Sequence, residues 1–156
     1  MLLVQHCSSD AQNIATLLQK IAVFEKQGKL TIQVLNPDIA YSPLCINAAF
    51  ETSEGKNSLL TTLALTQNFS SALKIAGAKD AQDFVLVAWG KGVKGSKGGK
   101  SAPKWEKISG ALGLKKLSWG KKDAAHFAHF YGISKEALKF YPLEKLIVEK
   151  MALSKL

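Results

Sequence analysis

Residues 90–103 form a glycine- and lysine-rich segment whose residue types are those that most often contact phosphate. The segment has five glycines and four lysines, and Gly99-Lys100-Ser101 matches the last residues of a phosphate-binding P-loop. The full motif also needs a glycine five positions before Gly99, where this chain has Lys94, and a helix directly after the serine, where it has Ala102-Pro103. The segment is therefore predicted to be a basic loop that attracts nucleic-acid phosphates by charge. The alternative is a solvated loop without a partner.

The positive charge of the chain is concentrated around this segment. The net charge is +9, and all 21 basic residues are lysines. Ten of them lie between Gly90 and Asp123, where only two residues are acidic, so this stretch has a net charge of +8. Without arginine the chain lacks the planar group that reads guanine by paired hydrogen bonds, so an acidic partner is expected to be held by Coulomb attraction. Trp105 and Trp119 flank the stretch, and their rings could either stack on bases or anchor the core.

The three histidines of the chain are not spaced like a metal or catalytic site. His126 and His129 are three residues apart on a predicted helix, but only Asp123 accompanies them, and a zinc site needs three or four protein ligands. His6 and Cys7 are neighbours on a predicted strand, so their side chains point to opposite faces and cannot act together as base and nucleophile. Paired carboxylates, a Ser–His–Asp arrangement and a dinucleotide-binding motif do not stand out. These patterns predict a protein that is not an enzyme and that uses no metal, cofactor or small-molecule substrate.

The elements that must position these residues alternate between short strands and helices. Continuous or alternating apolar runs predict strands at residues 1–7, 30–35, 84–89 and 114–119. Ser9 and Gln12 are spaced as a capping box, which predicts that the first helix follows Ser9 and ends near Gly28. Apolar stripes predict the remaining helices at residues 43–51, 57–66, 69–76, 105–112, 123–131, 134–141 and 143–155. Gly77 is expected to end the helix before it.

The order of these elements is βαβαααβαβααα, which indicates an α+β fold without the regular alternation of a doubly wound sheet. We expect a small mixed or antiparallel sheet of about four strands wrapped by helices. A length of 156 residues, of which 47% are hydrophobic, fits a single domain over residues 1–156 with the basic loop at 90–103 inside it. Cys7 and Cys45 have neither metal nor disulfide spacing, and no segment has the length and apolarity of a membrane span. The protein is therefore expected to be soluble and cytoplasmic.

The last predicted helix is apolar on two sides. One side is formed by Leu143, Leu146, Ile147, Met151 and Leu153. Val148 and Ala152 lie on the opposite side. A helix of this kind is either buried within its own domain or shared with another protein, and we expect a protein-binding surface here.

Several segments together resemble the kinase-binding subunit of the KEOPS complex, the CGI family of PRPK-binding proteins, in its archaeal form. Leu73-Lys74-Ile75-Ala76-Gly77-Ala78-Lys79-Asp80 followed by the strand Phe84–Val87 looks like the helix–glycine–strand signature of that family. Val34-Leu35-Asn36-Pro37-Asp38, with a following helix that contains Ala48, is similar to the family's second strand and next helix. The segment from Leu143 to Leu153 resembles its last helix. The similarity runs over nearly the whole chain in the right order, and none of these segments is catalytic.

The resemblance implies a non-catalytic subunit with two partners. One is the N-terminal lobe of an atypical protein kinase/ATPase, and the other is the tRNA on which the complex installs threonylcarbamoyladenosine, held through its single-stranded 3′ CCA end. The resemblance and the basic loop assign tRNA binding to Lys74, Gly77, Lys79, Gln67, Asn68, Lys94, Lys97 and Lys100. Kinase binding is assigned to Leu146, Val148, Met151 and Ala152. The chain departs from the family in the residues before the signature helix, Ala64-Leu65-Thr66-Gln67-Asn68, and in its lack of arginine, so lysines and backbone must supply the RNA contacts.

Two other hypotheses remain open at this point. A stand-alone basic RNA-binding module would use the lysine-rich loop and have no protein partner, which the apolar last helix argues against. An enzyme acting on a phosphate or nucleotide would use Gly99-Lys100-Ser101, which the broken motif spacing argues against.

Overall fold

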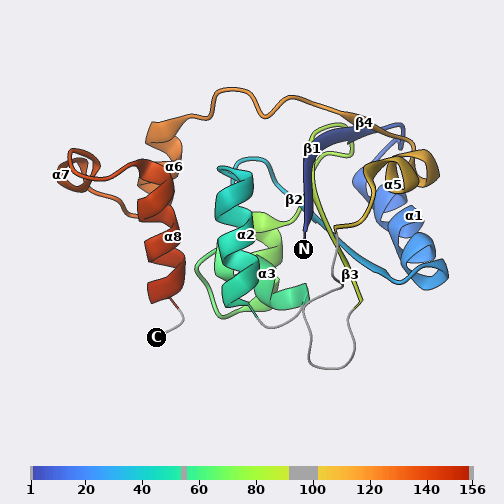
Figure 1. Cartoon of the computed structure of the whole chain (residues 1–156), viewed down its shortest axis with the longest axis horizontal. Coiled ribbons are helices and arrows are strands. Elements are labelled where there is room, and N and C mark those ends of the chain that lie inside the picture. Colours follow the sequence, from blue (N-terminus) through green and yellow to red (C-terminus); the bar gives the residue numbers. More distant parts are fainter. Residues whose placement is uncertain (1, 54–55, 92–101, 155–156) are drawn as a thin grey trace. The chain divides into compact units, whose positions relative to one another are not determined.

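The computed structural model describes residues 2–53, 56–91 and 102–154, so most of the basic segment at 90–103 lies outside the described residues (Figure 1). The chain groups into two compact units, and each is built from two separate stretches. We call them the sheet unit, Met1–Pro37 with Ala78–Ser118, and the helical unit, Asp38–Gly77 with Trp119–Leu156. The order of elements is the predicted βαβαααβαβααα, and the α+β fold is confirmed. The prediction of one domain over residues 1–156 stays a prediction.

The sheet unit contains a four-stranded antiparallel sheet with the strand order β2-β3-β1-β4. The strands are β1 (Leu3–Ser9), β2 (Leu30–Leu35), β3 (Phe84–Gly90) and β4 (Leu114–Lys116). The continuous apolar run of β3 explains its inner position, because an inner strand with both faces covered carries no polar side. The short β4, with two consecutive lysines, forms an edge, where charged residues discourage pairing with other chains.

Helices α1 (Ile14–Gln27) and α5 (Trp105–Leu112) lie on the same side of this sheet (Figure 1). Alternate residues of the strands point towards them and form one core with the buried sides of the two helices. The core residues include Cys7, Ile32, Val34, Phe84, Leu86 and Ala88 from the strands and Leu17, Ile21, Ile108 and Leu112 from the helices. His6, the neighbour of Cys7, points to the other face, as predicted from strand periodicity.

The start of α1 differs from the prediction. Ser9 is the last residue of β1, where its hydroxyl donates to the Ala81 carbonyl at 2.7 Å, so it cannot cap the helix. Asn13 is the cap instead, and its side-chain oxygen accepts a hydrogen bond from the Thr16 N–H at 2.9 Å. The end of α1 at Gly28 is as predicted.

The helical unit consists of six helices in the described residues. They are α2 (Pro43–Thr52), α3 (Lys56–Leu63), α4 (Phe69–Ala76), α6 (Ala124–Phe130), α7 (Lys135–Leu138) and α8 (Leu143–Leu153). Helix α2 packs against α3 and α8, and α8 also packs against α6. The phenol of Tyr131 ties the turn after α6 to the end of α3 by donating to the Leu63 carbonyl at 3.0 Å.

Gly77 ends α4, as predicted, but for a reason other than a left-handed turn. Its φ of −68° and ψ of 145° are an extended conformation that any residue adopts, and its N–H donates to the Leu73 carbonyl at 3.0 Å. A Cβ atom at this position would lie 2.5 Å from the Leu73 carbonyl oxygen. The position therefore requires glycine because space is lacking, with no need for backbone freedom.

Candidate functional site

The lysines are distributed unequally between the two units. The sheet unit has twelve lysines and five acidic residues, whereas the helical unit has nine lysines and seven acidic residues. Most of the net charge of +9 therefore belongs to the sheet unit. Such an excess raises the local concentration of polyanions and speeds their association.

Most acidic side chains of the sheet unit have hydrogen-bond or ion-pair partners elsewhere in that unit. They therefore do not neutralise its main group of exposed lysines. The engaged pairs are Asp10 with Lys20, Asp83 with His6, Asp80 with the Gln82 backbone N–H and Glu25 with the Ile32 backbone N–H. Lys104, Lys107, Lys115 and Lys116 are all exposed and, within the part of the chain that the structure describes, have no carboxylate within 4.0 Å. These four lysines are available to an external anion.

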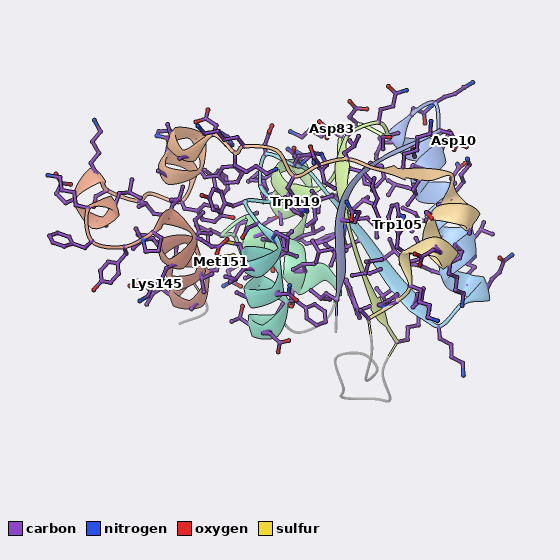
Figure 2. All side chains as sticks on the ribbon, turned by 45° about the horizontal axis from the view of Figure 1, so that its top comes forward. Asp10, Asp83, Trp105, Trp119, Lys145 and Met151 are labelled. Carbon is purple, nitrogen blue, oxygen red and sulfur yellow. The ribbon has the colours of Figure 1, made fainter. Side chains whose placement is uncertain are left out.

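Both tryptophans beside this cluster are half-buried. Trp105 packs against the core of the sheet unit, and the ammonium of Lys116 lies 5.6 Å from the centre of its ring (Figure 2). Trp119, the first residue of the second stretch of the helical unit, has the ammonium of Lys122 at 5.1 Å. Each ring thus holds a lysine close to a partly apolar surface by a cation–π contact. Trp105 serves the core, which was one of its two predicted roles.

The residues predicted to contact tRNA around α4 fall in both units. Gln67, Asn68 and Lys74 are exposed in the helical unit, while Lys79 is exposed in the sheet unit. Asn68 caps α4, because its side-chain oxygen accepts from the Ser71 N–H at 3.0 Å. Gly77 is buried and cannot offer a surface, although its small size permits the close turn between Lys74 and Lys79. The three loop lysines of the same prediction, Lys94, Lys97 and Lys100, lie outside the described residues.

The four residues predicted to bind a kinase differ in accessibility. Met151 is 1% exposed and lies inside the helical unit, and Leu146 is also buried (Figure 2). Val148 is half-buried and Ala152 is exposed. The side of α8 that a partner could reach therefore includes Ala152 and the neighbouring Leu153, which is 52% exposed.

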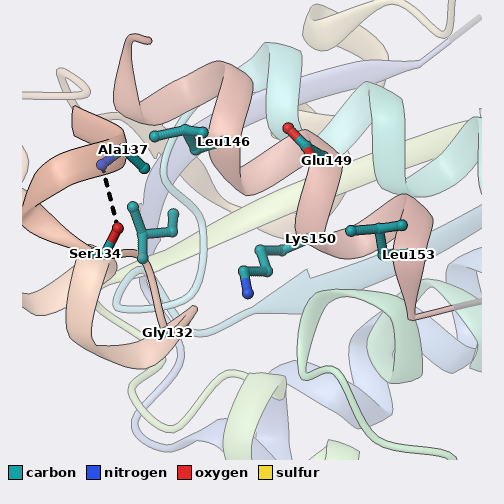
Figure 3. A pocket seen from close by; sticks show the side chains of 8 residues that line it. Gly132, Ser134, Ala137, Leu146, Glu149, Lys150 and Leu153 are labelled. Atoms are coloured by element: carbon teal, nitrogen blue, oxygen red, sulfur yellow. Dashed lines mark hydrogen bonds between the residues drawn. The ribbon is translucent and has the colours of Figure 1, made fainter. Parts of the chain in front are cut away.

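Sequence reasoning missed an apolar surface around α7 and α8. Leu138, Phe140, Tyr141 and Leu153 are exposed, with Phe140 at 78%, and we call them the α7–α8 apolar residues. Leu153 also lines a cavity of about 230 Å³, together with Gly132, Ile133, Ser134, Ala137, Leu146, Glu149 and Lys150 (Figure 3). The sequence feature that could have revealed these exposed residues is Phe140-Tyr141-Pro142, but a helix was predicted over residues 134–141. Helix α7 instead ends at Leu138, which leaves the aromatic residues in an exposed turn.

The two cysteine thiols are held neutral, and both ring nitrogens of His6 have partners. Burial raises the pKa of the Cys7 thiol to about 12 and that of the Cys45 thiol to about 11, and only the thiolate form is a good nucleophile. The two ring nitrogens of His6 face the Asp83 carboxylate at 2.5 Å and the Ser118 carbonyl at 3.0 Å. In the described residues, no three His, Cys, Asp or Glu side chains gather closely enough to hold a metal ion. None of the helices there has the length and apolar character needed to cross a membrane.

No protein-family model and no curated protein matches this chain. The choice between the hypotheses therefore depends on the surfaces themselves. These surfaces are the basic sheet unit and the exposed apolar side chains of the helical unit.

Proposed function

We propose that the protein is a non-catalytic cytoplasmic subunit that binds tRNA and an atypical protein kinase/ATPase, as the kinase-binding subunit of the KEOPS complex does. The observation that carries the proposal is the unequal distribution of charge and exposed apolar side chains: the sheet unit holds most of the net charge, and the α7–α8 apolar residues belong to the helical unit. A stand-alone RNA-binding module would need only the first surface.

The RNA half of the proposal is supported by the type and placement of the charges. Lysine ammonium groups bind phosphates as point charges, so affinity is expected to fall steeply with salt and to depend little on base sequence. Lys74 and Lys79, which flank the buried Gly77 in the sequence, add two exposed charges. These are the positions at which the 3′ CCA end is proposed to bind.

The protein half of the proposal is supported by exposed side chains that water solvates poorly. Exposed aromatic and aliphatic residues beside an apolar cavity are common at protein interfaces, where aromatic anchors supply much of the affinity. Because Leu146 and Met151 are buried, the kinase is proposed to contact α8 through Ala152 and Leu153 and the turn through Phe140 and Tyr141.

The RNA half is tested by measuring the affinity for labelled tRNA, intact and lacking the 3′ CCA, at several salt concentrations. The proposal expects tighter binding of the intact molecule and loss of that difference in the double variant K74Q/K79Q. Equal affinity for both tRNAs would refute CCA recognition and would favour the stand-alone RNA-binding module if the kinase also fails to bind.

The protein half is tested by the affinity for the kinase of the variants A152E and L153E. A buried charge opposite an apolar partner should weaken binding by about tenfold or more. The matched control is L18E, because Leu18 on α1 of the sheet unit is 48% exposed and should tolerate the change without loss of kinase binding. Equal behaviour of all three variants would contradict the proposed kinase surface.

A further inference from the structure

A polar cleft lies in the sheet unit where β1 ends beside β4 and the turn that leads into β3. It has a volume of about 350 Å³ and is lined by Ser8, Ser9, Asp10, Gln82, Gly113, Lys115 and Leu117. Of these residues, only Lys115 belongs to the lysines discussed above as available to an anion. The cleft adjoins the lysine cluster, because Lys115 belongs to both.

Two of the polar groups in the cleft are already used within the protein. The Ser9 hydroxyl donates to the Ala81 carbonyl at 2.7 Å and accepts from the Ala11 N–H at 3.3 Å. The Asp10 carboxylate lies 3.2 Å from the Lys20 ammonium, which compensates its charge (Figure 2 shows Asp10 beside α1). The charged groups of the cleft are thus the Asp10 carboxylate, paired with Lys20, and the Lys115 ammonium.

Three other groups in the cleft have no partner. In the described part of the chain, the Ser8 hydroxyl, the Gln82 side-chain amide and the Lys115 ammonium make no hydrogen bond and no ion pair. Ser8 stands directly opposite Lys115 in the β1–β4 pair, so the two side chains leave the same face of the sheet as close neighbours. The cleft is thus lined by three residues whose ammonium, hydroxyl and amide groups are not used within the described part of the protein.

The need to protect the edge strand β4 from pairing with other chains explains only part of this arrangement of side chains. Lysines on an edge strand discourage pairing with other chains, and either Lys115 or Lys116 would serve that purpose. The role does not explain why Ser8 and Gln82, on β1 and on the turn before β3, line the same cleft as Lys115. A ligand that accepts several hydrogen bonds and carries negative charge accounts for all three.

The main-chain course around Gly113 keeps this cleft accessible. Gly113 has a left-handed backbone, with φ of +66°, and any Cβ there would collide with the Asp10 carboxylate. The Asp10 N–H donates to the Gly113 carbonyl at 3.1 Å, which fixes the wall of the cleft to the end of β1. The cleft is therefore a defined feature of the fold, held open by a glycine that cannot be replaced without strain.

We infer that the cleft binds a phosphate group of the bound RNA backbone, with Lys115 supplying the charge and Ser8 and Gln82 supplying hydrogen bonds. The inference rests on the proposed RNA binding and adds a phosphate position that is distinct from the Lys74–Lys79 segment. RNA is favoured as the source because the sheet unit carries most of the net positive charge of the chain, which attracts a polyanion. A free phosphate ion would use the same three groups, so the experiment separates the two sources.

The test compares tRNA affinity and its salt dependence for K115Q, for S8A/Q82A and for the control K107Q, which removes an equally exposed lysine of the sheet unit outside the cleft. K115Q should weaken binding by about five- to tenfold. It should also reduce the salt slope, by about 0.7 for a single-stranded phosphate. S8A/Q82A should weaken binding by about threefold or more without changing the slope, because no charge is lost. K107Q should have a clearly smaller effect than K115Q.

Equal losses for K115Q and K107Q, with none for S8A/Q82A, would overturn the inference while leaving the proposed RNA binding intact. A wild-type protein that fails to bind tRNA would instead refute the proposed function. In that case a titration with inorganic phosphate at constant ionic strength, followed by amide NMR shifts, tests whether the cleft binds a free phosphate ion. Saturable shifts at Ser8, Gln82 and Gly113 that vanish in S8A/Q82A would retain a phosphate cleft for small anions, and their absence would overturn it.

Discussion

At the scale of single residues, the buried thiols make the stability of the protein depend on alkaline pH. Cys7 is 0% and Cys45 is 2% exposed, and burial raises their pKa values from the usual 9.0 to about 12 and about 11. Above pH 9 the unfolded chain loses these protons while the folded chain keeps them, so the stabilisation present below pH 9 is lost as the pH rises. We expect a loss of about 1.4 kcal/mol for each thiol between pH 8 and pH 10.

This dependence is measured by urea unfolding at a series of pH values. The variant C45A should show a weaker decline between pH 8 and pH 10 than the wild type, whatever its stability at pH 8. A wild-type stability that is flat over this range would show that the thiols are hydrated in the folded protein.

Gly77 allows a second prediction at the same scale. Replacement by alanine would place a Cβ atom 2.5 Å from the Leu73 carbonyl oxygen, so G77A should destabilise the protein by about 1–3 kcal/mol through overpacking. The matched control is G110A in α5, where nothing lies within 4 Å of the new Cβ. That change should stabilise by about 0.5–1 kcal/mol, because alanine is the better helix former. Urea midpoints that move in the same direction for both variants would contradict the argument.

At the scale of elements, the cap of α1 is the place where local sequence rules and the structure disagree. Ser9 and Gln12 have capping-box spacing, but β1 extends through Ser9 because its pairing with Leu114 and its bond to Ala81 hold it in the sheet. Those partners are 105 and 72 residues away in the sequence, counted from Ser9, so no local pattern could have revealed them. Asn13 was available as a cap four residues later and is used.

The capping role of Asn13 predicts that N13A destabilises the protein by about 1 kcal/mol, because the Thr16 N–H and hydroxyl both lose their acceptor. N13D and N13S keep a capping oxygen and should retain most of the stability. Chemical denaturation of the three variants is the measurement, and equal losses for all three would show that Asn13 contributes by something other than capping.

The other element boundaries were predictable to the extent that they depend on nearby residues. Pro43 and Ser42 mark the start of α2, and Gly28 and Gly77 mark the ends of α1 and α4, because capping acts within one turn. Strand 114–119 and helix 134–141 were predicted too long. Strand β4 ends at Lys116, and the next residue, Leu117, donates its N–H to the His6 carbonyl of β1 at 2.8 Å. The sequence gives no sign of this contact, because His6 is far away along the chain.

At the scale of the whole molecule, the order of elements and the antiparallel sheet followed from apolar periodicity, whereas the division into two units did not. Both units have similar hydrophobic patterns, and the chain passes between them three times. The unequal charge was visible as the basic stretch from Gly90 to Asp123. Its assignment to one unit required the fold, which adds Lys20, Lys26, Lys29 and Lys79 to that unit and removes Lys121 and Lys122.

The two-unit arrangement predicts where each partner perturbs the protein. Addition of tRNA should shift amide NMR signals of the sheet unit and of Lys74, and addition of the kinase should shift those of α7 and α8. Raising the salt concentration should reverse the first set and leave the second largely in place, because only the first depends on phosphate charge. Perturbations by tRNA that centre on Phe140 and Tyr141 would contradict the assignment of partners to units.

The three passages between the units, after Pro37, Gly77 and Ser118, also have a genetic consequence. Each unit is encoded by two separated stretches of the gene, so a break within residues 38–118 leaves both units incomplete. A fragment covering residues 1–77 would hold half of each unit, and residues 78–156 would hold the complementary halves. Recombination at the Gly77 junction therefore transfers neither unit whole, whereas a junction after Ser118 keeps the sheet unit together and separates it from the α7–α8 apolar residues.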